Sequence, residues 1–249
     1  MAEARLHDWL AAEPFALAMS SGFFSFFAHT GMLASLTAAG FAPNLVAGSS
    51  AGALVGGAWA AGLDAATLRE RLLAVRRDDF WDPSPGAGLL AGRKLDRILR
   101  DLLPVTAMSH CRVPVRVSAF DIAGRRTAVL DDADLADAIR ASCAVPALFH
   151  PVWIDRRAYW DGGILDRPGL AGVAAGTRLL FHHIASKSPW RTRLSVPRRT
   201  GMVTLVIDGL PRSGPFRLDA GRRALALARE ATLRALEAPI VDGVVRVVA

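Results

Sequence analysis

The sequence contains two cysteines, one tyrosine and, between residues 14 and 63, no charged side chain. Two cysteines, Cys111 and Cys143, are too few for a disulfide scaffold and indicate free thiols in a reducing compartment. The charge-free stretch does not predict a membrane span, because residues such as Ser20 and Gly40 interrupt it before about 18 apolar residues accumulate. A strand and a helix buried in a parallel α/β sheet produce the same pattern.

A secretory leader is not expected either. Residues 1–14 include Glu3, Arg5 and Glu13, and such charges do not fit the pattern of a signal peptide. The 249 residues, of which 52% are hydrophobic and 21% charged, fit one globular domain over residues 1–249. We therefore expect a cytoplasmic protein with no transmembrane span.

The chain is basic, with a net charge of +7 and an isoelectric point near 10.7. This excess favours contact with an anionic membrane surface or a phosphate-bearing substrate. Nucleic acid is disfavoured, because the arginines are scattered and no nucleic-acid-binding motif accompanies them. One basic segment favours peripheral contact with anionic lipid, a solvated loop being the alternative. Its residues are Lys187, Trp190, Arg191, Arg193, Arg198 and Arg199.

The most informative pattern is Gly48-Ser49-Ser50-Ala51-Gly52, which fits the G-x-S-x-G sequence of a nucleophile elbow. An apolar run precedes it and a small-residue helix follows, so Ser50 is expected on a sharp strand-to-helix turn. The two glycines relieve the crowding of that turn, and the helix N-terminus directs N–H groups towards a developing oxyanion. Alternatively, Gly48 and Gly52 only permit close helix–strand packing.

The elements around this turn predict an α/β fold. Strands are expected at residues 15–19 and 44–47, followed by helices at residues 23–39 and from Ser50 onwards. This β-α-β-α order is typical of a parallel sheet. Later strands are predicted at residues 178–184 and 202–207, a long helix at 219–236 and an edge strand at 244–248.

A catalytic serine needs a base, and the residues leave two arrangements open. Asp161 follows an apolar strand end and precedes two glycines, where partial burial would raise its pKa; an ordinary Asp-Gly turn is the alternative. The second arrangement is a Ser-Asp-His triad in α/β-hydrolase order, with His182 or His183 as its histidine. Both lie in an apolar strand pattern, which favours a structural role. His29 is also interpreted as structural, packed under the turn after the first strand.

Four blocks, in order, resemble the patatin-like phospholipase family of the bacterial single-domain type. Residues 17–33 resemble its glycine-rich oxyanion block, and residues 48–53 its elbow. Residues 141–152 resemble the block before its catalytic aspartate, and residues 159–163 its Asp-Gly-Gly sequence. The resemblance covers residues 17–168, and no block matches beyond them.

The resemblance implies a three-layer α/β/α sandwich with a mostly parallel central sheet. It implies that the chain hydrolyses acyl esters of lipids through an acyl-enzyme, with Ser50 as nucleophile and Asp161 as base in a dyad without histidine. The backbone N–H groups of Ser21, Gly22 and Phe23 are implied as the oxyanion hole. No cofactor is expected, and no metal, because Asp131, Asp132 and Asp134 read as a turn and a helix cap rather than a calcium site.

Three serines depart from the family pattern. Ser20 and Ser21 stand where the family has glycines, and Ser25 stands where it has an arginine. A serine keeps its backbone N–H but adopts a left-handed conformation less easily than glycine. Loss of the arginine removes a nearby positive charge. These departures favour, as an alternative, a lipid-binding protein with weak or absent catalysis.

Four phenylalanines crowd the start of the first predicted helix: Phe23, Phe24, Phe26 and Phe27. A helix cannot turn four such side chains to one side, so some of them are expected in the core. Phe23, Phe24 and Phe27 are predicted to line an acyl channel beside Ser50.

Overall fold

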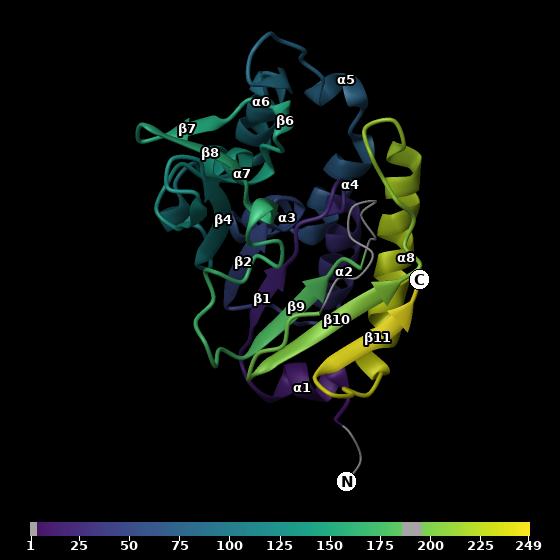
Figure 1. The fold of residues 1–249 in the computed structure, drawn as a ribbon. Helices are drawn as coiled ribbons and strands as arrows, with labels where there is room; N and C mark the ends of the chain where they lie inside the picture. Colours follow the sequence, from purple (N-terminus) through teal and green to yellow (C-terminus); the bar gives the residue numbers. More distant parts are fainter. Residues whose placement is uncertain (1–3, 186–195) are drawn as a thin grey trace.

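The computed structural model describes residues 4–185 and 196–249 (Figure 1). Nine of its strands belong to one sheet. Their bounds are β1 Ala16–Met19, β2 Leu45–Ser49, β4 Val115–Asp121, β5 Arg126–Leu130, β7 Val152–Ile154, β8 Arg157–Asp161, β9 Leu179–His183, β10 Met202–Asp208 and β11 Val244–Val248. Two shorter strands, β3 (Gly88–Leu90) and β6 (Ala147–Phe149), form a separate parallel pair.

The main sheet has the strand order β11-β10-β9-β1-β2-β4-β8-β7, and β5 also pairs with β4. Strands β11 to β4 along this order are parallel, whereas β5 and β8 run antiparallel to β4. The predicted α/β class with a mostly parallel sheet is confirmed. The register pairs Met19 with Gly48, Ser49 with Ser118, and Ala119 with Asp161. The ends of β1, β2 and β8 therefore meet along one edge of the sheet.

The helices that contribute to the core pack on one face of this sheet. The helix bounds are α1 Leu6–Ala12, α2 Phe26–Ala38, α3 Ala51–Ala60, α4 Ala65–Ala74, α5 Arg77–Phe80, α6 Arg93–Leu102, α7 Leu135–Cys143 and α8 Leu218–Glu237. Side chains at alternate strand positions, such as Leu17 and Met19, join these helices in the main core. Helices α2 and α8 lie so close that a Cβ at Gly31 would overlap the Leu225 carbonyl oxygen.

The opposite face of the sheet has a smaller apolar cluster. Ala16, Ala18 and Phe181 point to this side and pack with Leu170 and Val173 from the turns that follow β8. Among residues 4–185 and 196–249, no helix is both long and apolar enough to cross a membrane.

The basic segment falls partly outside the described residues, which exclude Lys187, Trp190, Arg191 and Arg193. Arg199 is described, and its Nη1 donates to the carbonyl oxygens of Leu170 and Val173 at 3.1 Å. Its guanidinium group therefore holds the turns against the second face of the sheet.

One difference from the predicted elements affects the site. Helix α2 begins at Phe26, not at residue 23, because residues 22–25 form a turn in which the Ser25 N–H donates to the Gly22 oxygen at 3.0 Å. Phe24 has a φ of 57°, which a helix does not allow. The N–H groups of Gly22 and Phe23 consequently lie outside the helix.

Candidate active site

Ser50 lies at the junction between β2 and α3, with φ 52° and ψ −117°. A serine in such a conformation costs on the order of 1–3 kcal/mol and persists only where the surroundings impose it. A Cβ at Gly48 would lie 2.5 Å from the carbonyl carbon of Gly52, and a Cβ at Gly52 would overlap the Met19 carbonyl oxygen. Both glycines are therefore required by the close approach of β1, β2 and α3.

A chain of hydroxyl hydrogen bonds fixes this turn. The Ser50 N–H donates to Ser142 Oγ at 2.7 Å, and the Ser142 hydroxyl donates to the Ser118 carbonyl oxygen at 2.6 Å. Ser142 belongs to α7, so the hydrogen bonds connect the turn to α7 and β4. Sequence reasoning did not single out Ser142, and its position in the block at residues 141–152 was the only signal.

Asp161 ends β8 and is only 5% exposed. Its Oδ1 accepts a hydrogen bond from the Gly163 N–H at 2.7 Å, whereas Oδ2 accepts none from the described residues. Burial raises the pKa of Asp161 to about 6, although the Ser50 hydroxyl and the Gly163 N–H act to lower it. Ser49 pairs with Ser118 of β4 and Asp161 pairs with the adjacent Ala119, so the strand ends that carry Ser50 and Asp161 lie beside neighbouring positions of β4.

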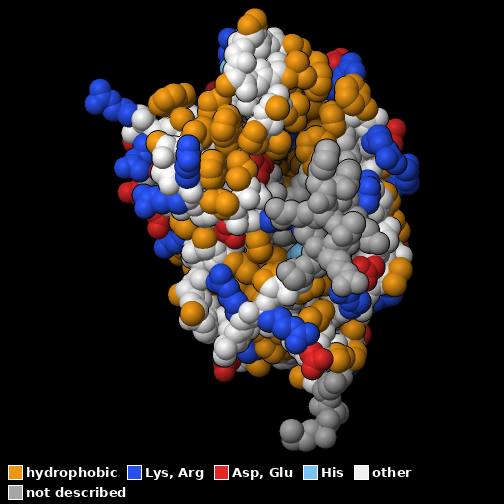
Figure 2. All heavy atoms as spheres, in the orientation of Figure 1, with side chains coloured by type: hydrophobic (Ala, Val, Ile, Leu, Met, Phe, Trp, Pro, Cys, Tyr) orange, Lys and Arg blue, Asp and Glu red, His pale blue; other side chains and the backbone are white. Residues whose placement is uncertain are grey.

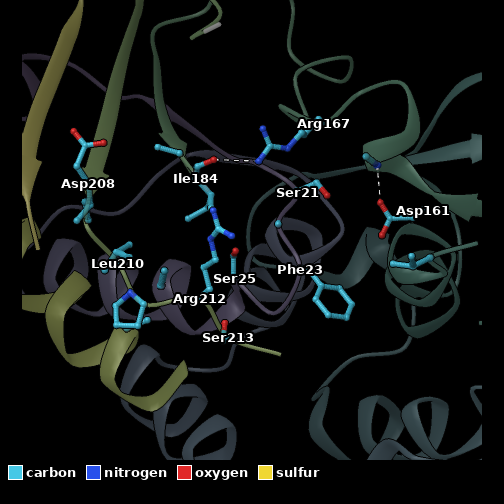
Figure 3. Close-up of a pocket in the computed structure, with 18 of the residues that line it drawn as sticks. Ser21, Phe23, Ser25, Asp161, Arg167, Ile184, Asp208, Leu210, Arg212 and Ser213 are labelled. Carbon is cyan, nitrogen blue, oxygen red and sulfur yellow. Dashed lines mark hydrogen bonds between the residues drawn. The ribbon is translucent and has the colours of Figure 1, made fainter. Parts of the chain in front are cut away.

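The two glycines after Asp161 allow its loop to enter the site. A Cβ at Gly162 would overlap the Ser118 carbonyl oxygen, and a Cβ at Gly163 would overlap Ser21 Oγ. The loop therefore lies against both β4 and the turn after β1. Figure 3 shows Asp161 facing the side where Ser21 and Phe23 lie.

The three predicted oxyanion donors are not equivalent. The Ser21 N–H donates to the Arg167 carbonyl oxygen at 2.7 Å, so it is occupied in this conformation. The N–H groups of Gly22 and Phe23 donate to no group in the described part of the chain. Two adjacent backbone donors therefore remain open at the end of β1.

A buried pair of histidines supports this turn from below. His29 Nε2 lies 2.8 Å from the Ser20 carbonyl oxygen and must donate to it, which leaves His29 Nδ1 to accept from His182 Nδ1 at 2.8 Å. Burial lowers the pKa of His29 to about 4 and that of His182 well below its ordinary value, so both rings are neutral at pH 7. The structural role predicted for His29 agrees with these contacts.

The triad alternative gains no support from these positions. His182 donates to His29, and His183 follows it on β9 and so points to the opposite side of the sheet. Burial, with Arg167 and Arg246 nearby, lowers the pKa of His183 to about 4.

Two cavities meet at the site. The larger cavity has a volume of about 530 Å³, and Asp161 and several polar side chains are among its lining residues. The smaller cavity, of about 130 Å³, is lined mostly by apolar side chains and also by Ser50. Gly22 and Phe23 line both cavities. The two open N–H groups therefore lie between the serine side and the aspartate side. Among the described residues, no group of three His, Cys, Asp or Glu side chains could hold a metal ion.

The prediction that Phe27 lines the acyl channel is wrong. Phe23 and Phe24 line it as expected, and Phe26 does so as well. Phe27 does not: its side chain is fully buried and its ring covers Gly221 of α8. Because α2 starts at Phe26, successive side chains diverge by about 100° around the helix, which turns Phe27 towards α8. The other lining residues are Ala51, Leu54, Leu72, Val75, Phe80, Leu95, Ile98, Leu99, Leu102, Cys143, Leu148 and Phe149.

The fold and site define an α/β protein with a serine on a strained strand-to-helix turn, next to a buried aspartate. The family model described as patatin-like phospholipase matches residues 17–173, more than half of the chain, and the chain belongs to this family. Residues 17–33, 48–53, 141–152 and 159–163, on which the resemblance rested, all lie within the match.

Similar proteins are longer than this chain. An uncharacterized NTE family protein of Mycobacterium tuberculosis is 36% identical over 166 residues, which are 64% of this chain and 45% of that protein. A second uncharacterized NTE family protein of the same species is 30% identical over 161 residues, 63% of this chain and 27% of the relative. The chain thus matches less than half the length of these relatives. Among solved structures, VipD from Legionella pneumophila has a similar fold, with a TM-score of 0.56 at 15% identity, over 90% of this chain and 67% of VipD.

Proposed function

We propose that this chain is a serine acyl hydrolase that cleaves carboxylic esters of lipids through Ser50, Asp161 and an acyl-enzyme intermediate. The observation that carries the proposal is the position of Ser50, on a strained turn beside a buried carboxyl with a pKa of about 6. A carboxyl with this pKa is ionised at neutral pH and is more basic than an exposed one, as a general base requires.

Each step of the proposed reaction has a group to perform it. Ser50 Oγ attacks the carbonyl carbon and its proton passes to Asp161 Oδ2, which accepts no hydrogen bond from the described residues. The N–H groups of Gly22 and Phe23 stabilise the oxyanion of the tetrahedral intermediate. Asp161 returns the proton to the alcohol as the ester bond breaks. Water, deprotonated by Asp161, then attacks the acyl-enzyme. The bond from the acyl carbon to Ser50 Oγ breaks, Ser50 takes the proton back from Asp161, and the acid is released.

The surroundings favour a lipid substrate. The apolar cavity beside Ser50 suits an acyl chain, and Phe23, which lines its edge, is 54% exposed. Figure 2 shows apolar side chains gathered over the part of the molecule where α5, α6 and β6 lie in Figure 1. Leu89 of β3 and Trp153 of β7 are also exposed. We propose that these side chains contact the lipid surface peripherally, and that residues 1–249 act as a single hydrolase domain.

The test is hydrolysis of p-nitrophenyl hexanoate together with labelling by a fluorophosphonate. Wild type should turn over and take the label. Ser50→Ala should lose both properties, and Asp161→Asn should lose about a hundredfold or more in kcat. Ser109→Ala and Asp132→Asn change exposed residues of the same types and should behave as wild type.

Two results would contradict the proposal. If folded Ser50→Ala hydrolyses the ester at the wild-type rate, another group performs the reaction. If wild type neither turns over nor takes the label, the chain is instead a lipid-binding protein, as the serines at positions 20, 21 and 25 suggest. Circular dichroism of every variant separates these outcomes from unfolding.

A further inference from the structure

The apolar cavity beside Ser50 is small for a site that is to hold an acyl chain. Its volume is about 130 Å³. For comparison, an engineered apolar cavity of about 150 Å³, lined by leucine, isoleucine and phenylalanine side chains, binds one benzene molecule. Benzene has six carbons, so the cavity beside Ser50 has room for about six carbons of an acyl chain. A longer chain would need space that this cavity does not offer.

Helix α6 provides one wall of this cavity. Its apolar side chains follow the pattern i, i+3, i+4 and i+7, which places them on one face of the helix. All four line the cavity: Leu95, Ile98, Leu99 and Leu102. Arg97, which lies between them in the sequence, is exposed. The apolar face of an amphipathic helix is therefore used to enclose the cavity.

This wall is held in place at both ends of α6. At its start, Asp82 accepts hydrogen bonds from the N–H groups of residues 92, 93 and 94, at 3.1, 2.7 and 3.2 Å. In its last turn, Arg100 pairs with Asp134 and Asp137 at the start of α7, at 3.1 and 3.0 Å. Asp96 also pairs with Arg140 of α7 at 3.2 Å, so the ion pairs form a network rather than an isolated contact. These contacts oppose a movement of α6 away from α7 that would enlarge the cavity.

The lining side chains differ in their distance from solvent. Phe23, at the edge of the cavity, is exposed, whereas Leu99 is only 1% exposed. Leu99 and Leu72 of α4 both belong to the main core, so the cavity ends where the core begins. Leu54 lies four residues after Ser50, about one turn further along α3, and lines the cavity between the serine and this end.

We propose that Leu72 and Leu99 close the acyl site after about six carbons, so that this chain selects esters of short acyl groups, with hexanoyl as the longest that fits. The inference rests on the proposed hydrolysis and specifies its acyl group. An acyl chain on Ser50 passes Leu54 and ends against the two leucines. Each methylene buried in the cavity raises kcat/KM about fourfold. A methylene beyond the sixth carbon finds no space there, so this gain stops.

The first experiment measures kcat/KM for p-nitrophenyl esters from acetate to decanoate, each below the concentration at which it aggregates. For wild type, kcat/KM should rise about fourfold per methylene up to hexanoate and no further. Leu99→Ala removes three carbons from the closed end, so the rise should continue about three carbons further. Leu54→Phe adds three carbons inside the cavity, so the rise should stop about three carbons earlier. Leu68→Ala is the matched control, because Leu68 is fully buried but lines neither cavity, and its limit should stay at hexanoate.

Two results of this experiment would overturn the inference. If kcat/KM of wild type rises past hexanoate to decanoate, the cavity does not limit the chain length. If Leu54→Phe has the wild-type limit, the acyl chain does not occupy this cavity. Leu99→Ala and Leu68→Ala each empty a core position, and Leu54→Phe, which fills space that is already open, keeps the test decisive if neither of them folds.

The second experiment measures binding without hydrolysis, by calorimetry of Ser50→Ala with methyl ketones. The affinity should rise with chain length up to 2-heptanone, which has as many carbons beyond its carbonyl group as hexanoate, and then stay level. If no ester is cleaved but the ketones show this limit, the proposed hydrolysis fails and the six-carbon site stands. An affinity that rises steadily to 2-undecanone, or no binding of any ketone, would overturn the site itself.

Discussion

Replacing Asp161 by asparagine should stabilise the folded protein at neutral pH while it removes the proposed base. Burial raises the pKa of Asp161 from 3.8 to about 6, so folding favours the protonated carboxyl. Because the folded-state pKa is raised, the stability that this group contributes is fully present below the unfolded value and is lost as pH rises through about 6. Asparagine resembles the protonated carboxyl and cannot ionise.

The size of the effect follows from the shift. A rise of about two units corresponds to about 3 kcal/mol of unfolding free energy, since each pKa unit is worth 1.36 kcal/mol. The side chain is only 5% exposed, so solvent screens little of this difference. Of the total, about 2 kcal/mol should develop between pH 4.5 and pH 7.5, where unfolded Asp161 is already ionised and the folded carboxyl becomes so.

The assay is urea unfolding of wild type and Asp161→Asn at both pH values. The difference in unfolding free energy between the two proteins should shift by about 2 kcal/mol in favour of the variant on going from pH 4.5 to 7.5. The other titrating groups contribute equally to the pH dependence of unfolding in both proteins, so their contributions cancel in the difference. Asp132→Asn, at an exposed position, should show no such shift. A difference that does not depend on pH would refute burial as the cause of the raised pKa.

Three further predictions concern the walls of the site. Gly52→Ala places a Cβ on the carbonyl oxygen at the end of β1 and should destabilise the fold by about 2 kcal/mol or more, which lowers Tm by about 4–8 °C or more. Gly214→Ala meets only an ordinary contact and should be tolerated in the same thermal melt. Phe27→Ala should lower the free energy of unfolding in urea by about 3–5 kcal/mol, because this side chain is fully buried. Phe26→Ala should mainly change the relative kcat/KM of p-nitrophenyl esters of different chain length, because Phe26 lines the apolar cavity. The reverse pattern would contradict this assignment of the two side chains. Ser142→Ala leaves the N–H of the proposed nucleophile buried without its acceptor, so the free energy of unfolding should fall by about 1–3 kcal/mol. We also expect kcat to fall at nearly constant KM. Unchanged stability and kcat would show that this hydrogen bond does not hold the turn.

The sequence alone was sufficient to predict the α/β class and the strand-to-helix turn at Ser50. The charge-free residues 14–63 and their β-α-β-α order require buried parallel strands, and only glycine fits two residues before and after the serine. Local patterns of this kind depend on neighbours within a few residues, so they can be read along the chain. The same reasoning predicted the edge strand at residues 244–248, which is β11.

Only the tertiary structure decided what surrounds the turn. Ser142 bonds to the Ser50 N–H across 92 positions of sequence, and His29 meets His182 across 153, distances over which no periodicity carries information. The onset of α2 at Phe26, which turned Phe27 into the core, depended on a positive φ at Phe24. The sequence could therefore name the serine and the aspartate, but packing between distant segments determined which N–H groups stay open and which side chains line the cavities beside them.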